Sequence, residues 1–125
     1  MELNLSTFDV LMCFVCSLGS PQQVIISGAS GNNAAFVNGS FLCVDELYNG
    51  RALYRKDGDP NAWLRYCLDS YWGVSTTANK VANNNYNYAH SVNPGMAFAT
   101  GESLWNVFAD GKWVEQKAVR MSPAV

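Results

Sequence analysis

Four cysteines and a single histidine are the residue types in this sequence that could hold a metal ion or carry redox chemistry. Cys13 and Cys16 have the spacing of a metal or redox pair, and either Cys43 or Cys67 together with His90 could complete a site. A structural zinc site needs four ligands, however, and a second pair at similar spacing is absent from the sequence. A reactive thiolate also needs an electropositive, partly exposed position, whereas the first pair lies in an apolar run. We therefore expect buried, reduced thiols, above all at Cys43 and Cys67, rather than a metal, a cofactor or one of the three full disulfide pairings.

The run Gly28-Ala29-Ser30-Gly31-Asn32-Asn33 follows an apolar run at residues 24–27, as the phosphate-binding turn of a dinucleotide fold would. Such a turn works only where a helix begins at the loop, because the backbone amides of its first turn bind the phosphates. Here Asn38-Gly39 breaks any helix after four further residues. We interpret the run as a tight loop between two strands and not as a nucleotide site.

Acidic and basic side chains form no catalytic constellation in the sequence. Asp57, Asp59 and Asp69 each stand in a predicted turn, where Asp has structural reasons to occur. His90 has no recognisable nucleophilic partner, and the G-x-S-x-G elbow of serine hydrolases is absent. We therefore do not expect an enzyme.

Aromatic and amide side chains are the combination that best suits a ligand. Sugar rings combine apolar faces with hydroxyl groups, so exposed Trp or Tyr beside Asn or Asp can bind them. A polar run together with Trp63 or Trp72 could supply both kinds of contact. We name this run the Asn–Tyr loop, and its residues are Asn84, Asn85, Tyr86, Asn87 and Tyr88. The alternative is that both tryptophans lie in the core.

Composition limits the classes of partner. Only 14% of the 125 residues are charged and the formal net charge is −2, so the sequence lacks the basic stripe that nucleic-acid binding requires. We do not expect nucleic acid as a partner. Apolar residues make up 49% of the chain, which is enough for one domain with its own core.

Residues 1–20 differ from the rest of the chain, residues 21–125, which we expect to form the β domain. Ser6 or Thr7 can cap a helix that runs almost wholly apolar until Gly19 and Pro21 end it. This helix is too short to cross a bilayer, which takes about 20 residues. It either packs on the sheet or docks on a protein partner or a membrane assembly. The residues of the docking hypothesis are Phe8, Leu11, Met12, Phe14, Val15 and Leu18.

Strand-like runs dominate the remainder. Asn49-Gly50 and Asp110-Gly111 each separate two such runs and predict hairpins, and residues 63–68 carry bulky side chains on both faces, as a central strand does. We expect another strand at 95–100, and a long loop at 76–94 that contains one strand near 86–90. The predicted fold is mainly β: one antiparallel sheet, as a meander, compact sandwich or half-barrel, with one short apolar N-terminal helix.

The order of these motifs resembles that of a known domain. SGASG, VNG, ELYNGRALYRK, WLRY and WGVS, with a closing Trp hairpin, are similar to a repeat-like β domain of large proteins in algae, dinoflagellates and oomycetes. The resemblance covers about residues 24–121. It implies an all-β accessory or interaction domain and carries over no catalytic residue. This chain departs from the pattern in its Asn- and Tyr-rich stretch at 78–92 and in its apolar N-terminal segment.

These observations lead to two hypotheses about function. The first is a non-catalytic accessory subunit or protein–protein interaction module of a larger assembly, docked through the N-terminal helix and the Asn–Tyr loop. The range of the resembling domain suggests a plastid membrane complex, such as a photosynthetic one, and an intracellular or organellar rather than secreted location, with membrane contact only through the helix. The second is a lectin-like module that binds glycans through exposed Trp, Tyr and Asn.

Overall fold

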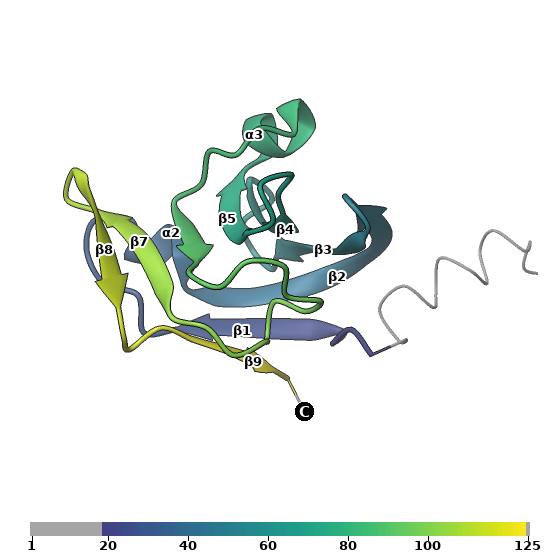
Figure 1. The fold of residues 1–125 in the computed structure, drawn as a ribbon, viewed down its shortest axis with the longest axis horizontal. Coiled ribbons are helices and arrows are strands. Elements are labelled where there is room, and N and C mark those ends of the chain that lie inside the picture. The colour runs from purple at the N-terminus through teal and green to yellow at the C-terminus, as the bar shows by residue number, and fades with distance from the viewer. Residues whose placement is uncertain (1–18, 125) are drawn as a thin grey trace, which may run out of the picture.

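Turn-forming residues divide the chain into short strands, which the computed structural model of residues 19–124 arranges in one antiparallel sheet (Figure 1). The strands are β1 (Gln23–Ser27), β2 (Gly39–Tyr48), β3 (Arg51–Lys56), β4 (Ala62–Tyr66), β5 (Trp72–Thr76), β6 (Ala89–Ser91), β7 (Trp105–Ala109), β8 (Lys112–Gln116) and β9 (Arg120–Pro123). Two short helices, α2 (Ala34–Val37) and α3 (Thr77–Ala82), interrupt them. The expected mainly β fold is thereby confirmed.

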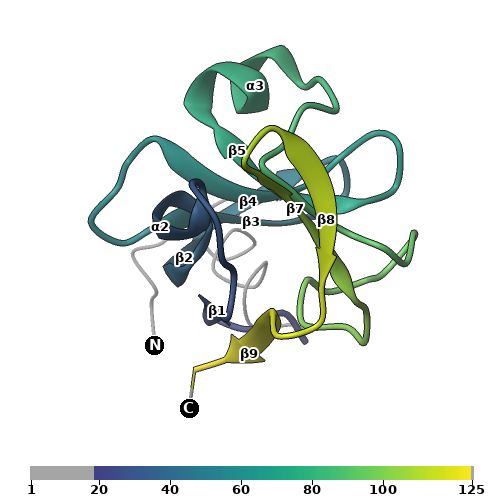
Figure 2. The ribbon, with the colours of Figure 1, turned by 90° about the vertical axis from the view of Figure 1, so that its left-hand side faces the viewer.

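The sheet is a meander whose last strand returns to its first. Its order is β8-β7-β6-β5-β4-β3-β2-β1-β9, so each strand up to β8 pairs with its neighbour in sequence and β9 pairs with β1. The sheet curls into a half-barrel, one of the three expected shapes, with its strands around a common interior (Figure 2). Strands β8 and β9 are its two edges.

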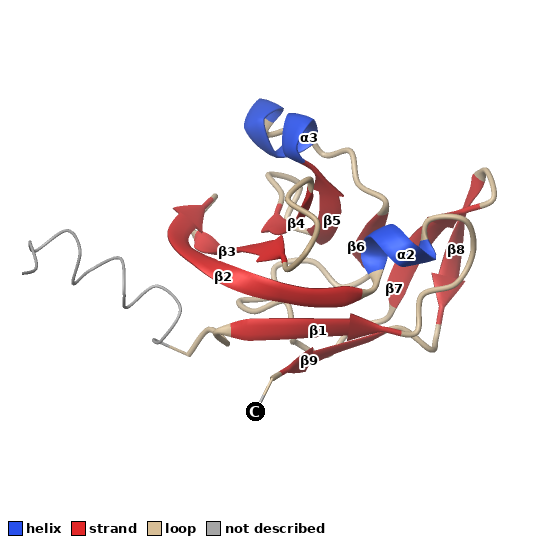
Figure 3. Ribbon diagram, turned by 180° about the vertical axis from the view of Figure 1, so that it is seen from behind, coloured by secondary structure: helices blue, strands red, loops and turns tan. Residues whose placement is uncertain are grey.

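The interior is filled by alternate residues of the strands, as the period of a strand requires. Its largest apolar members include Trp72, Trp105, Tyr54 and Phe41, each at most 1% exposed. Strand β4 is buried on both faces, which confirms the prediction of a central strand. Its outer face is covered by α3, which lies over β4 and β5 (Figure 3). There the Trp63 indole donates to the Thr77 hydroxyl at 2.8 Å, and the ammonium of Lys80 lies 4.5 Å from the ring centre.

Both predicted hairpins are present. Asn49 and Gly50 have φ values of 52° and 83°, and the β7–β8 turn at Asp110-Gly111 repeats this conformation. Two consecutive left-handed residues match the right-handed twist of the flanking strands, which is why Asn-Gly and Asp-Gly occur in such turns. The remaining register is close to regular, with one irregularity in β2 between Cys43 and Leu47.

The glycine-rich run follows β1 and packs against the end of β8 and the turn after it. A Cβ on Gly28 would lie 1.9 Å from the carbonyl oxygen of Ala118, so only glycine allows this approach. The Gln116 amide bonds both backbone groups of Ser30, at 2.9 and 3.0 Å. Asn38 does the same for Ala29, at 3.0 Å in each direction. We call these contacts the seam. The run is the expected loop after β1, and the four-residue α2 follows it before β2 begins.

Three sequence expectations need correction. The stretch at 76–94 is not a single long loop with one strand, because α3 forms at its start: the Thr76 hydroxyl accepts from the amide of Asn79 at 3.3 Å, and Asn83 ends the helix in the left-handed conformation. Residues 95–100 form turns rather than a strand. Leu68 lies beyond the end of β4 and is 66% exposed.

The predicted N-terminal helix and its docking residues, Phe8, Leu11, Met12, Phe14, Val15 and Leu18, lie outside the described residues. Cys13 and Cys16 lie outside them as well. Within residues 19–124, no helix combines the length and the apolar character needed to cross a membrane.

Candidate functional site

A buried arginine lies on the outer face of β4, beneath the segment that follows β5. Arg65 lies in the middle of β4 and is fully buried, yet its guanidinium is surrounded by acceptors. These are the carbonyl oxygens of Asn79 (2.9 Å) and Tyr86 (2.8 Å), the side-chain oxygens of Asn87 (3.1 Å from Nη2 and 3.3 Å from Nε) and Asn84 (3.4 Å), and the Tyr48 hydroxyl (3.3 Å). We call this set the Arg65 cage.

The cage contains no carboxylate. Among residues 19–124 the one ion pair joins Lys80 to Glu46, at 3.7 Å. A buried cation is costly unless its hydrogen bonds are satisfied, and here neutral oxygen dipoles satisfy them. Two asparagine side chains of the Asn–Tyr loop, those of Asn84 and Asn87, supply acceptors for this cation.

Asn87 links the cage to the buried thiol of Cys67. Its oxygen accepts from Arg65, and its amide nitrogen lies 3.4 Å from the Cys67 sulfur. Burial raises the pKa of Cys67, and the Asn87 hydrogen bond opposes that rise. Cys67 is therefore the buried, reduced thiol that the sequence predicts. Cys43 is disulfide-bonded, which corrects the expectation of a reduced thiol at that position.

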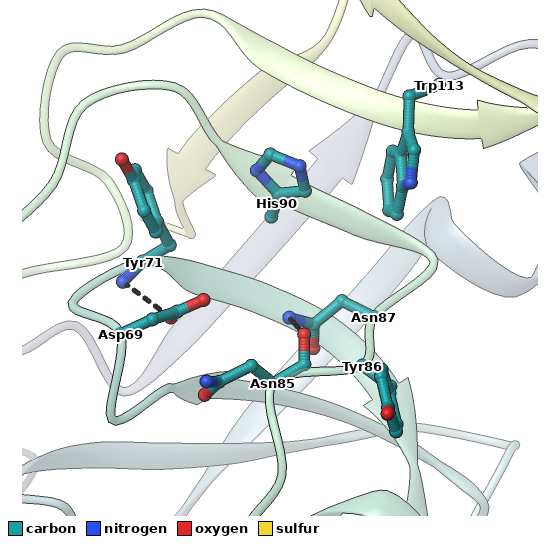
Figure 4. A pocket seen from close by; sticks show the side chains of 7 residues that line it. All are labelled: Asp69, Tyr71, Asn85, Tyr86, Asn87, His90 and Trp113. Carbon is teal, nitrogen blue, oxygen red and sulfur yellow. Dashed lines mark hydrogen bonds between the residues drawn. The ribbon is translucent and has the colours of Figure 1, made fainter.

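A pocket of about 320 Å³ lies beside the Arg65 cage (Figure 4). It is lined by Asp69, Tyr71, Asn85, Tyr86, Asn87, His90 and Trp113. In Figure 4 the rings of Tyr71, His90 and Trp113 form a row along one side, and Asp69, Asn85 and Asn87 face them from the other. We refer to these two sides as the aromatic wall and the polar wall.

Direct ring contacts hold the aromatic wall. The His90 ring centre lies 5.9 Å from that of Tyr71 and 4.7 Å from that of Trp113, and Trp113 also packs edge-on against Phe108 at 5.3 Å. Nδ1 of His90 lies 2.9 Å from the carbonyl oxygen of Ser91. Because a carbonyl can only accept, this contact assigns the proton of the neutral ring to Nδ1 and leaves Nε2 as an acceptor.

The sheet topology brings the two walls together. His90 on β6 pairs with Asn106 on β7, and Phe108 of β7 pairs with Trp113 of β8, so the rings share the outer face of these strands. Asp69 and Tyr71 come from the β4–β5 turn, where an Asp69 oxygen accepts from the Tyr71 amide at 3.3 Å. Asn85 and Asn87, the other two residues of the polar wall, follow α3, and Asn87 is held in place by Arg65.

The Asn–Tyr loop is divided between these features. Asn85, Tyr86 and Asn87 line the pocket, Asn84 contacts Arg65, and Tyr88 packs edge-on against Phe36 at 5.0 Å. The two tryptophans considered as sugar contacts are core residues instead: Trp63 is 8% exposed and Trp72 is 1% exposed.

Sequence reasoning missed the aromatic wall. Trp113 is 46% exposed, and the alternation of β8 could have placed it on the outer face opposite Val114. The ring neighbours of Trp113, His90 and Phe108, could not be predicted from the sequence, because their contacts depend on the pairing of β6, β7 and β8. Asp57 and Asp59 lie outside the pocket lining, and Asp59 accepts from the Asn61 amide at 3.1 Å, a turn contact as expected.

The described residues hold no group of three or more Cys, His, Asp or Glu side chains placed to bind a metal ion. Comparisons of this chain with protein-family models, curated proteins and solved structures gave no match. The resemblance to the repeat-like β domain therefore stays a prediction.

Proposed function

We propose that this protein is a non-catalytic binding module and that its ligand is carbohydrate, held between the aromatic wall and the polar wall. The observation that carries this proposal is the arrangement of the pocket itself: three rings face two amides and a carboxylate across one cavity. A sugar ring has the matching chemistry, since its C–H face packs on aromatic rings while its hydroxyl groups bond amides and carboxylates.

The groups that would meet a ligand are accessible. Trp113 and Tyr86 are 46% and 73% exposed, so a ligand can reach both side chains. The Asn85 side chain and the indole nitrogen of Trp113 have no hydrogen-bond partner among residues 19–124, so both can serve a ligand. Asn87 is committed to Arg65 and Cys67, and its role is to hold the polar wall in place.

The pocket favours binding over hydrolysis. Most glycosidases place two carboxyl groups on either side of the bond they cleave. Asp69 is the one carboxylate among the seven lining residues. A single carboxylate in the pocket agrees with a module that binds a glycan without cleaving it.

Replacing Trp113 with alanine should weaken glycan binding at least about tenfold, because the largest stacking surface of the pocket is lost. A glycan array would identify the ligand, and isothermal titration would measure the dissociation constants. Phe98→Ala is a matched control, since Phe98 is an aromatic residue that is 38% exposed and does not line the pocket. Equal binding by the Trp113 variant and the unsubstituted protein would refute this site.

Docking on a protein partner, as an accessory subunit of a larger assembly, is the second candidate function. Ile25 of β1 and Leu42 of β2 are each 41% exposed on neighbouring strands, where Gln23 pairs with Leu42 and Ile25 with Ser40. Such an apolar outer face suits a protein interface. A plastid membrane complex and docking by residues 1–20 stay hypotheses within this second candidate.

The double substitution Ile25→Asp and Leu42→Asp tests the docking candidate, because two charges oppose burial at an interface. If this face docks, the unsubstituted protein should elute at the size of a complex in gel filtration of extracts from its source. The double variant should elute at the size of a monomer. Trp113→Ala should leave the size of the complex unchanged. An unchanged size in the double variant would exclude this face as the docking surface.

A further inference from the structure

The pocket contains one charged side chain, and it is negative. Asp69 is exposed, and neither lysine nor arginine is among the residues that line the cavity. On the basis of the carbohydrate-binding function proposed above, we propose that the preferred ligand is an amino sugar, whose protonated ammonium pairs with the Asp69 carboxylate while its ring packs on the aromatic wall.

The Asp69 carboxylate has capacity left for such a ligand. One of its oxygens accepts from the Tyr71 amide at 3.3 Å, and this turn contact orients the group. The other oxygen has no partner among residues 19–124. Figure 4 shows the carboxylate on the polar wall, opposite the rings of Tyr71 and His90. An ammonium group placed between the two walls would meet a carboxylate on one side and the faces of aromatic rings on the other, and both attract a cation.

The positive charge of Arg65 does not cancel this preference. Arg65 is fully buried and does not line the pocket, whereas Asp69 lines the pocket and is exposed to a ligand. The interaction between charges falls with distance and is screened by solvent, so the contacting carboxylate dominates. For the same reason, anionic sugars such as uronic acids should bind weakly, since their carboxylate would face Asp69.

The experiment compares oligomers of glucosamine with oligomers of N-acetylglucosamine, which differ in the charge of the amine, by isothermal titration of the full chain. We expect the glucosamine oligomer to bind about fivefold more tightly, as an exposed ion pair allows, and this ratio to shrink at high salt. Asp69→Asn keeps the acceptor for the Tyr71 amide and removes the charge. In that variant the ratio of the two dissociation constants should fall to about one.

The outcomes separate this inference from the proposed function. A ratio near one in the unsubstituted protein, or a ratio that persists in Asp69→Asn, overturns the amino-sugar preference while binding at Trp113 still stands. Binding of neutral glycans alone, lost in Trp113→Ala, likewise overturns only the preference. Failure of every glycan to bind overturns the proposed function and the preference with it.

Discussion

Replacing Arg65 with methionine should lower the free energy of unfolding by about 3 kcal/mol or more, because several buried acceptors lose their partner at about 1 to 3 kcal/mol for each group. Methionine fills much of the same space but donates no hydrogen bond. The carbonyl groups of Asn79 and Tyr86 and the side chain of Asn87 would lose their partner inside the protein. Such unsatisfied groups carry the full cost of their desolvation. Chemical denaturation followed by tryptophan fluorescence would measure the loss.

Arg55→Met is the matched control for Arg65→Met. Arg55 lies on the adjacent strand β3 and contacts the ring of Trp63, with 5.2 Å between guanidinium and ring centre, but it is exposed. Its replacement should cost less than about 1 kcal/mol. If Arg65→Met cost no more than Arg55→Met, the Arg65 cage would not be the support of the polar wall.

Gly28→Ala should lower the free energy of unfolding by about 3 kcal/mol or more, because a conformational penalty and a steric clash add. The φ of Gly28 is 88°, a conformation that disfavours a side chain by about 1 to 2 kcal/mol, and the new Cβ would lie 1.9 Å from the Ala118 carbonyl oxygen. Backbone on both sides of the seam would have to move, and the bonds between Gln116 and Ser30 would be strained with it. Thermal unfolding of the variant would measure the effect.

Gly50→Ala separates the two penalties. Gly50 has nearly the same φ, 83°, but no atom lies within 4 Å of the position that its Cβ would take. Its replacement should therefore cost only the conformational term, about 1 to 2 kcal/mol. Equal losses in the two variants would mean that the seam tolerates the added methyl group and that its close packing is not required.

Much of the fold could be predicted because its signals are local. Asn49-Gly50 and Asp110-Gly111 specify their turns by backbone conformation alone, and the bulky residues on both faces of β4 indicated a central strand. The return of β9 to β1 could not be predicted, because it depends on contacts between residues about a hundred positions apart. Helix α3 was missed because its capping by Thr76 and Asn83 outweighs the weak helix preference of residues such as Thr77 and Asn79.

The candidate site was predicted only in part. The Asn–Tyr loop was identified by its composition, and three of its residues line the pocket. Two of its asparagines, Asn84 and Asn87, bond the buried Arg65, which the sequence shows only as a charged residue in an otherwise apolar strand. Trp63 and Trp72 were considered as ligand contacts, although their indole nitrogens donate to Thr77 and Met96 inside the protein. An aromatic residue's exposure depends on its neighbours across the sheet, and sequence alone does not reveal them.

The central claim is that carbohydrate binds between the aromatic wall and the polar wall. The most direct test is a nuclear magnetic resonance titration of the isotope-labelled protein with the strongest ligand from a glycan array. We predict that the indole resonance of Trp113 and the side-chain amide of Asn85 shift most, while those of the buried Trp72 and Trp105 stay nearly unchanged. Shifts centred on Ile25 and Leu42, or none at saturating ligand, would contradict the account.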